Sequence, residues 1–516
     1  MKNHKNLSKQ ELMTRQDIPC VQLGGKFVSL NSKTEARQGG SRKKQAEQLL
    51  ATVVMGMNLV NTVAPLAVLA TAEQKLSVVP QPVRSEAEPL DYAMLPQLAD
   101  MVEKLVFARA YATDYDGNAS VADMGWADSQ TITAGQSGIV SVMSGGQQDI
   151  SSGGTGTVIT MSSGKQNIFD GTGTVSTIRN GEQLIYGGTG TVSTVKTDGN
   201  QKIYDGTGII NTMEGGYQFT QGGTAIIGTM SSGQQTINRG DTGTISAMQF
   251  GVQLIYSNGN GTVSTMSGGE QQIKNGAMGT VSTMSGGTQM VDSGGTGTVI
   301  TMSSGVQTIY SGGTGTVVTM NSGWQEIRGG TGTVSTLSGG RQNAYSGGNA
   351  TVSTMMNGIQ TVQEDAMGTV STMSGGQQSI SSGGTGIVST MSGGEQSISV
   401  GGAGTVGVML AGHQFVDVGG MGTVSIMSGG SQTIIEHGSG TVSTMLGGSQ
   451  RIFESGMGTI DIMSDGRQIM SGGTGTINTM NSGLQWLLSG GTGTIDVMHD
   501  GACRISEAAA RARSIL

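Results

Sequence analysis

The sequence from about residue 131 to residue 505 repeats itself every 17 or 18 residues. One unit reads GTVSTMSGGEQQIKNGAM, from Gly261 to Met278, and the next begins at Gly279. A central apolar residue recurs 21 times at this spacing, and it is methionine in 18 of the 21 cases. A unit this short cannot bury an apolar face by itself, so the period requires that the units stack on one another.

The segments between the turns predict β-strands. Gly-Gly or Ser-Gly pairs stand every eight to ten residues and mark turns. The residues between them are rich in Thr, Val, Ile and Ser, which favour strands, and the segments are too short for helices. We therefore expect an all-β chain in which residues 131–505 form a single parallel β-solenoid of about 21 coils. Coils about 4.8 Å apart would give a rod of roughly 100 Å, with small, partly helical caps.

Two residue types mark the interior of each coil. Five residues after the central apolar position stands Gln in 19 of 21 units, and an Ile, Val or Leu usually follows two residues later. Residues two apart on a strand face the same side, so we expect Gln and Ile to point inward together. Stacked Gln side chains can then bond to each other, because each carboxamide has both donors and an acceptor. The predicted core ladder includes Met266, Met284, Met302, Gln271, Gln289 and Gln307. The Thr-Val-Ser-Thr segment leaves open whether Val263 or Ser264 faces inward.

The amino-acid composition and the net charge argue against some classes of binding partner. Glycine accounts for 90 of 516 residues and charged residues for only 12%, against about 25% in average proteins. Residues 1–72 carry a net charge of +6 (ten basic, four acidic), whereas residues 73–516 carry −14 (17 basic, 31 acidic). An acidic, sparsely charged body argues against nucleic acid and anionic membranes as partners. Cys503 has no intrachain partner once Cys20 is removed with the head, so no disulfide framework is expected.

The basic head has the parts of an extended secretory signal peptide over residues 1–72. Arg42, Lys43 and Lys44 precede a mostly apolar stretch. Ala70 and Ala72 form an A-x-A site, which places cleavage before Glu73.

The flanks of the repeat region predict caps. Residues 73–130 should form an N-terminal cap or linker in which Leu95–Tyr111 is an amphipathic helix. Residues 506–516 should form a short helical cap or the start of a linker.

The chemical motifs give no catalytic, metal or cofactor site. The GGTGT segments resemble the start of a calcium-binding nonapeptide, but Val or Ile fills the Asp position. His413, His437 and His499 lie in different coils at different coil positions, so we expect neither a metal site nor a catalytic triad. The acidic residues are scattered rather than clustered. The sequence therefore predicts that the protein is not an enzyme and needs no cofactor.

Aromatic residues often follow the inward Ile, where strand alternation turns them outward. They are either isolated surface aromatics or a stacking stripe for sugars or for another rod. The stripe would consist of Phe169, Tyr186, Tyr256, Tyr310 and Tyr345. Tyr204 stands one place out of register with them.

The coils, such as Gly383–Gly402 with the sequence GGTGIVSTMSGGEQSISVGG, resemble the repeats of AIDA-type autotransporter adhesins. The resemblance covers residues 131–505. It implies a right-handed β-helix that is exported across two membranes to the cell surface or outer membrane, or secreted, and that mediates adhesion, autoaggregation or biofilm formation. The sequence departs from that pattern because no β-barrel translocator follows Ile505.

The resemblance also implies partners. These are other solenoids, host-cell or matrix glycans and proteins, and a heptosyltransferase that modifies serines. The candidate glycan acceptors, which could equally be plain turn residues, are Ser267, Ser285, Ser293, Ser311, Ser374 and Ser382. Two other functions stay open: a β-helix enzyme that processes polysaccharides, and an ice-binding solenoid, because Thr-Gly-Thr recurs in many coils.

Overall fold

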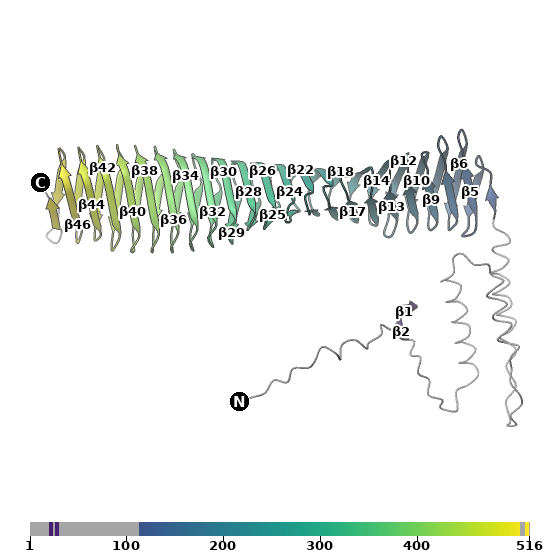
Figure 1. Ribbon diagram of the computed structural model, residues 1–516, viewed down its shortest axis with the longest axis horizontal. Helices are drawn as coiled ribbons and strands as arrows, with labels where there is room; N and C mark the ends of the chain where they lie inside the picture. Colours follow the sequence, from purple (N-terminus) through teal and green to yellow (C-terminus); the bar gives the residue numbers. More distant parts are fainter. Residues whose placement is uncertain (1–19, 24–25, 30–112, 506–510, 515–516) are drawn as a thin grey trace, which may run out of the picture. The chain divides into compact units, whose positions relative to one another are not determined.

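The computed structural model describes residues 20–23, 26–29, 113–505 and 511–514 (Figure 1). The chain divides into two units, Met1–Ala110 and Tyr111–Leu516. In the first unit, β1 (Cys20–Leu23) and β2 (Lys26–Ser29) form an antiparallel pair. The predicted cleavage site at Ala70, Ala72 and Glu73 and the predicted helix Leu95–Tyr111 lie outside the described residues.

The second unit is built from two alternating kinds of strand, most of them seven residues in one set and four or five in the other. The long-strand set comprises β4 (Ser120–Met124), β6 (Ser137–Met143), β8 (Thr155–Met161), β10 (Thr172–Ile178), β12 (Thr189–Val195), β14 (Thr207–Met213), β16 (Thr224–Met230), β18 (Thr242–Met248), β20 (Asn260–Met266), β22 (Met278–Met284), β24 (Thr296–Met302), β26 (Thr314–Met320), β28 (Thr331–Leu337), β30 (Asn349–Met355), β32 (Met367–Met373), β34 (Thr385–Met391), β36 (Ala403–Met409), β38 (Met421–Met427), β40 (Ser439–Met445), β42 (Met457–Met463), β44 (Thr474–Met480), β46 (Thr492–Met498) and β48 (Arg511–Ser514). The short-strand set comprises β3 (Asp114–Tyr115), β5 (Ser129–Ile132), β7 (Gln147–Ile150), β9 (Lys165–Ile168), β11 (Glu182–Ile185), β13 (Asn200–Ile203), β15 (Tyr217–Thr220), β17 (Gln234–Ile237), β19 (Val252–Ile255), β21 (Glu270–Ile273), β23 (Thr288–Val291), β25 (Val306–Tyr310), β27 (Trp324–Arg328), β29 (Arg341–Tyr345), β31 (Ile359–Val362), β33 (Gln377–Ile380), β35 (Glu395–Ile398), β37 (His413–Val416), β39 (Ser431–Ile434), β41 (Ser449–Phe453), β43 (Arg467–Ser471), β45 (Leu484–Leu487) and β47 (Ala502–Ile505).

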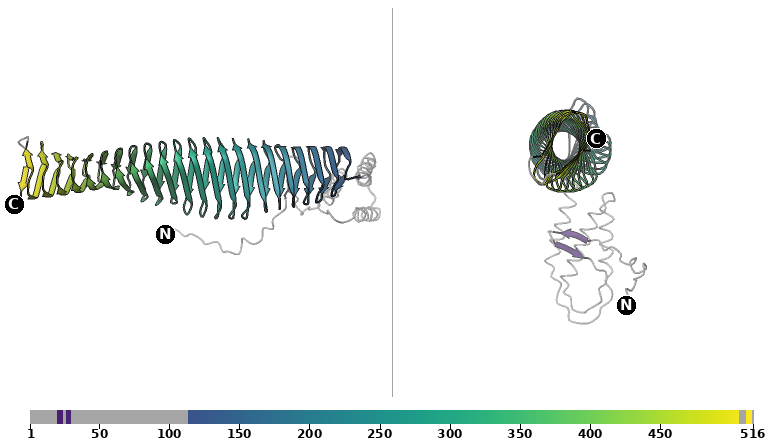
Figure 2. Two further views of the ribbon diagram at one scale, coloured as in Figure 1. Left: turned by 90° about the horizontal axis from the view of Figure 1, so that it is seen from above. Right: turned by 90° about the vertical axis from the view of Figure 1, so that its left-hand side faces the viewer.

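Each long strand pairs in parallel with the long strand one coil away, and the short strands do the same. Met278 on β22 pairs with Thr296 on β24, and Met284 pairs with Met302. The two sheets are open ladders that begin at β4 and β3 and end at β48 and β47. The predicted all-β parallel solenoid is thus confirmed, with about 22 coils. Figures 1 and 2 show the coils stacked along one axis, with the two sheets facing each other across the interior.

The long strands turn three residues inward, and this resolves the ambiguity of the Thr-Val-Ser-Thr segment. In β20, Gly261, Val263 and Met266 are buried, while Ser264 and Thr265 are exposed. The inward residues Val263 and Met266 are therefore three apart rather than two. The chain bends at the serine, which has no partner in the strand register. The Val and Met columns form one continuous apolar cluster along the coils.

The short strands carry the glutamine column, and all of its side chains are buried. Gln271 Nε2 donates to Gln253 Oε1 at 2.6 Å, and Gln289 Nε2 donates to Gln271 Oε1 at 2.7 Å. The same bond links successive coils from Gln130 to Gln485. The second amide hydrogen points to the opposite sheet, as when Gln271 Nε2 lies 3.3 Å from the carbonyl oxygen of Gly261. Among the described residues no buried side-chain nitrogen or oxygen lacks a hydrogen-bond partner.

The predicted start of the solenoid at residue 131 is wrong. Val121, Met124 and Gln130 already occupy the inward columns, and β3 and β4 precede β5 in the ladders. The sequence concealed this coil because Met124 stands 19 residues before Met143, outside the period of 17 or 18.

The predicted helix at residues 506–516 is also wrong where the structure describes it. Arg511–Ser514 form β48, which pairs with β46. An unpaired edge strand leaves a row of open N–H and C=O groups, and one more strand satisfies those of β46.

Candidate binding surfaces

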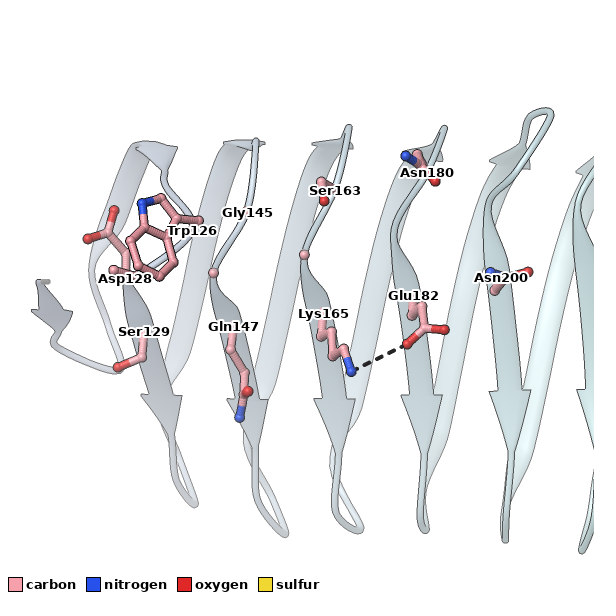
Figure 3. A pocket seen from close by; sticks show the side chains of 13 residues that line it. Trp126, Asp128, Ser129, Gly145, Gln147, Ser163, Lys165, Asn180, Glu182 and Asn200 are labelled. Atoms are coloured by element: carbon pink, nitrogen blue, oxygen red, sulfur yellow. Dashed lines mark ion pairs between the residues drawn. The ribbon is translucent and has the colours of Figure 1, made fainter. Parts of the chain in front are cut away.

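The first groove, called here the Trp126 groove, lies where the chain passes from long to short strands in the first coils. It encloses about 720 Å³ and is open to solvent. Trp126 stands at one end with its side chain 63% exposed (Figure 3). The carboxylate of Asp128 accepts hydrogen bonds from the backbone N–H groups of Thr113 and Gly125, at 3.0 and 2.8 Å. Asp128 therefore shapes the turn rather than offering a free charge to a ligand.

At the other end of the Trp126 groove, one glutamate is paired with two lysines. Glu182 lies 3.6 Å from Lys165 Nζ (Figure 3) and 2.6 Å from Lys202 Nζ. The three residues stand on successive short strands. Partial burial alone would raise the pKa of Glu182, but the hydrogen bond from Lys202 and the charges of both lysines hold it below its usual value. The same hydrogen bond raises the pKa of Lys202. The Trp126 groove thus combines an exposed indole with charged side chains that already bond to one another.

A second groove, called here the Trp324 groove, lies at the same turn in the middle of the solenoid. It encloses about 620 Å³, and its floor consists of turn glycines such as Gly340 and Gly358. Trp324 is 50% exposed, and Arg341 pairs with it in the strand register one coil further on. Arg341 forms no ion pair with any residue that the structure describes. Here an exposed indole and an uncompensated guanidinium lie side by side.

The predicted aromatic stripe is present only in part. Phe169 and Tyr186 stack with their ring centroids 5.0 Å apart and their planes 7° apart, and Tyr204 continues the stack. Tyr204 is in register because the coil before it carries an extra residue, which also brings Gln201 into the glutamine ladder. Tyr256, Tyr310 and Tyr345 are half-buried on separate coils, and they stack on no ring of a residue that the structure describes. Because the three stacked rings cover each other's faces, they present mainly edges to a ligand.

The six candidate acceptor serines are all exposed, and they fall at two turns of the coil. Ser267, Ser285 and Ser374 follow the buried Met at the end of a long strand. Each hydroxyl of this set donates to the carbonyl oxygen of the Met one coil earlier, at 3.3–3.4 Å. The second set follows a short strand at the opposite turn and comprises Ser293, Ser311 and Ser382. The serines therefore form two stripes on opposite edges of the coil.

Stacking also brings His413 beside Ser431, an arrangement that the sequence analysis did not anticipate. His413 Nδ1 lies 2.7 Å from Ser431 Oγ, and burial lowers the pKa of His413. The backbone N–H of Ser431 is bonded to the carbonyl of Gly412 at 3.0 Å, as are other N–H groups in the ladder. An oxyanion would therefore find no free N–H donor at this serine. In the part of the chain that the structure describes, no group of three or more His, Cys, Asp or Glu side chains could hold a metal.

The core ladder was predicted from the sequence, whereas neither groove was. Met266, Met284 and Met302 are fully buried, and Gln271, Gln289 and Gln307 lie in the hydrogen-bonded ladder. Trp126 and Trp324 carried a signal that could have been used, because they are two of only three tryptophans in the sequence.

Comparisons with known proteins give a distant structural likeness. No protein family matches the chain, and no curated protein does. One similar solved structure is the crystal structure of a TibA fragment whose hyper-glycosylation is catalysed by TibC. The match has 25% sequence identity and a TM-score of 0.35, and it covers 56% of this chain and all of the fragment. The fold assignment rests on the strand ladders and not on this match. No helix in the described residues is long and apolar enough to cross a membrane.

Proposed function

We propose that this chain is the passenger of an exported bacterial surface adhesin that aggregates cells by lying alongside further copies of itself. One observation carries the proposal: the outward face of the long strands places Thr at the same positions in most coils. In β24 and β26 the outward residues are mostly Thr, and Thr296 and Thr314 are neighbours in one column. Columns repeating about every 4.8 Å can make many weak contacts at once, and such contacts add up through multivalency.

The resemblance of the repeats to AIDA-type adhesins supports display at the cell surface or in the outer membrane, and a role in biofilm formation. The interior contributes a rigid frame, because the amide ladder and the apolar columns hold the coils in one register. The outer faces are thereby kept at a fixed spacing, which side-by-side contact between rods requires.

Display of residues 73–516 on cells that do not clump by themselves tests the proposal. Cells should sediment together, and deletion of residues 386–457 should weaken clumping. This deletion joins Thr385 to Gly458 in the same coil position and removes four whole coils. Absence of clumping would refute the self-association proposal, and absence of binding to host cells and matrix as well would refute the adhesin function.

We further propose that a heptosyltransferase modifies serines of the two exposed stripes. The hydroxyls of Ser267, Ser285 and Ser374 use only their hydrogen toward the chain, so each oxygen keeps lone pairs toward solvent. Co-expression with such an enzyme should add sugar masses to peptides from both turns. Alanine at the six serines should remove those masses, and sugars found only elsewhere would contradict this assignment.

A further inference from the structure

The Trp324 groove combines side chains in a way that suits one kind of ligand. Trp324 and Arg341 lie on adjacent coils, and Ile359 and Gln377 continue their column over the next two. Ser322, Ser338 and Asn357, which precede the turn glycines, also line the groove. We propose that this groove binds a strand of acidic polysaccharide that runs along the solenoid axis. The proposal rests on the adhesin function and deepens it by naming a class of ligand.

Charge is the first argument. No carboxylate lines the groove. Glu326, two residues after Trp324, pairs with Arg328 at 2.8 Å, and Glu395, one coil beyond Gln377, accepts a hydrogen bond from Gln377 at 2.9 Å. The guanidinium of Arg341 keeps its N–H donors for a ligand. A planar fork of donors matches a carboxylate or a sulfate, two acidic groups that are common in polysaccharides.

The shape of the groove is the second argument. From the coil of Trp324 to the coil of Gln377 the groove extends about 14 Å, three coil spacings. The half-exposed indole offers an apolar face on which the C–H face of a sugar ring can lie. The carboxamides of Asn357 and Gln377 can bond to sugar hydroxyls further along. The groove thus supplies one stacking surface, one anion contact and several hydroxyl contacts in a row.

The floor of the groove stays open because side chains cannot be placed there. Gly340 has φ +78°, a conformation that favours glycine, and an added Cβ would lie 2.6 Å from the carbonyl oxygen of Gly323. Gly358 has φ +84°, and its Cβ would lie 2.9 Å from the carbonyl oxygen of Gly340. Contact between coils therefore fixes the depth of the groove, while the rim residues vary freely.

A polysaccharide suits the groove better than a peptide or a nucleic acid. An extended peptide binds by pairing with free backbone groups. Here the N–H groups of Trp324, Arg341 and Ile359 already donate to carbonyls of the preceding coil at 3.0 Å. A single-stranded nucleic acid needs several aromatic platforms and several cations, and this groove has one of each.

Titration calorimetry on the purified full chain tests the inference. The probes are oligogalacturonate, a heparin-derived oligosaccharide and a fully methyl-esterified oligogalacturonate. At least one acidic probe should bind, and the esterified one should bind at least tenfold more weakly. Trp324→Ala and Arg341→Gln should each weaken binding about tenfold, the effect of losing one good contact. Trp126→Ala, which removes an exposed indole from a groove whose lysine is already paired with Glu182, should change affinity less than twofold.

Several results would overturn the inference: no binding of either acidic probe, equal binding of acidic and esterified probes, no effect of Trp324→Ala, or preference for poly-glutamate over both glycans. Since Trp324 and Arg341 face outward, unchanged thermal melting should accompany the loss of binding. The clumping assay separates this inference from the proposed function. Glycan binding without clumping would refute the self-association proposal alone, and clumping without glycan binding would refute the groove assignment alone.

Discussion

Strand β22 begins and ends with methionines in opposite surroundings: Met278 is 52% exposed, and Met284 is completely buried. The column of Met278 also holds Thr, Asn, Ser and Ala in other coils, whereas the column of Met284 is almost all Met. An inward side chain packs against the coils on either side of it and must match both. An outward side chain meets mostly water and needs to match nothing. A column that keeps the same residue in nearly every coil is therefore a column that faces the interior.

One buried position departs from the repeat pattern, and a second substitution nearby satisfies the polar group that it introduces. Thr220 takes the place of Ile in the short-strand column, and the apolar cluster is interrupted there. Its hydroxyl donates to Asp241 Oδ2 at 3.0 Å, and Asp241 stands where most coils have Gly. The buried polar group is thus satisfied, as burial requires.

The largest difference between the faces should appear on truncating a methionine. Met284→Ala should lower the free energy of unfolding by about 2–5 kcal/mol, because it leaves a cavity in the continuous column. Met278→Ala, six residues earlier on the same strand, should change it by less than about 0.5 kcal/mol. Denaturant unfolding of the two variants measures both. Similar losses would show that the faces do not differ as described.

The next largest difference should appear between two adjacent glutamines. Gln271→Leu removes a donor and an acceptor from the ladder and leaves Gln253 and Gln289 each short of a partner, at a cost of about 2–4 kcal/mol. Gln272→Leu changes an outward side chain that bonds only to Glu270, and it should be nearly neutral. Thermal melting and local hydrogen exchange can compare them. Two neutral outcomes would mean that the amide ladder does not stabilise the solenoid.

Repairing the interrupted coil should stabilise the chain modestly. The double variant Thr220→Ile, Asp241→Gly restores the apolar column and should gain about 1–2 kcal/mol, as consensus repairs commonly do. Burial raises the pKa of Asp241, so its contribution to stability is present below the unfolded pKa and is lost as pH rises through the folded value. The gain should therefore be larger at pH 7 than at pH 3. Chemical unfolding at both pH values tests this, and a double variant less stable than Asp241→Gly alone would contradict it.

The smallest effect should come from the outward ion network. Glu182→Gln should cost at most about 1 kcal/mol at pH 7, because exposed ion pairs contribute little. The pKa of Glu182 is lowered in the folded chain, so its contribution is present above the unfolded pKa and is lost as pH falls through the folded value. The difference between variant and parent should vanish in acid and shrink in high salt. A difference that grows on acidification would contradict the assigned lysine contacts.

The interior could be predicted from the sequence because stacking gives each coil position the same surroundings in every coil. Met284 and Gln271 were therefore recognisable from their columns alone. The inward choice between Val263 and Ser264 was not, since it depends on where the strand bends. The end strand β48 depends on the open edge of β46, which no period reveals. The grooves depend on single residues, Trp126 and Trp324, that break the pattern.

Distances between exposed labels test the stack most directly. With Cys20 and Cys503 replaced by serine, spin labels can be attached to cysteines at Met278, Met367 and Met457, which share one outward column. Met278 and Met367 are five coils apart, and Met278 and Met457 are ten coils apart. Coils spaced by about 4.8 Å predict label separations of roughly 25 Å and 50 Å. Separations that fail to double with the number of coils would contradict the solenoid and everything inferred from its columns.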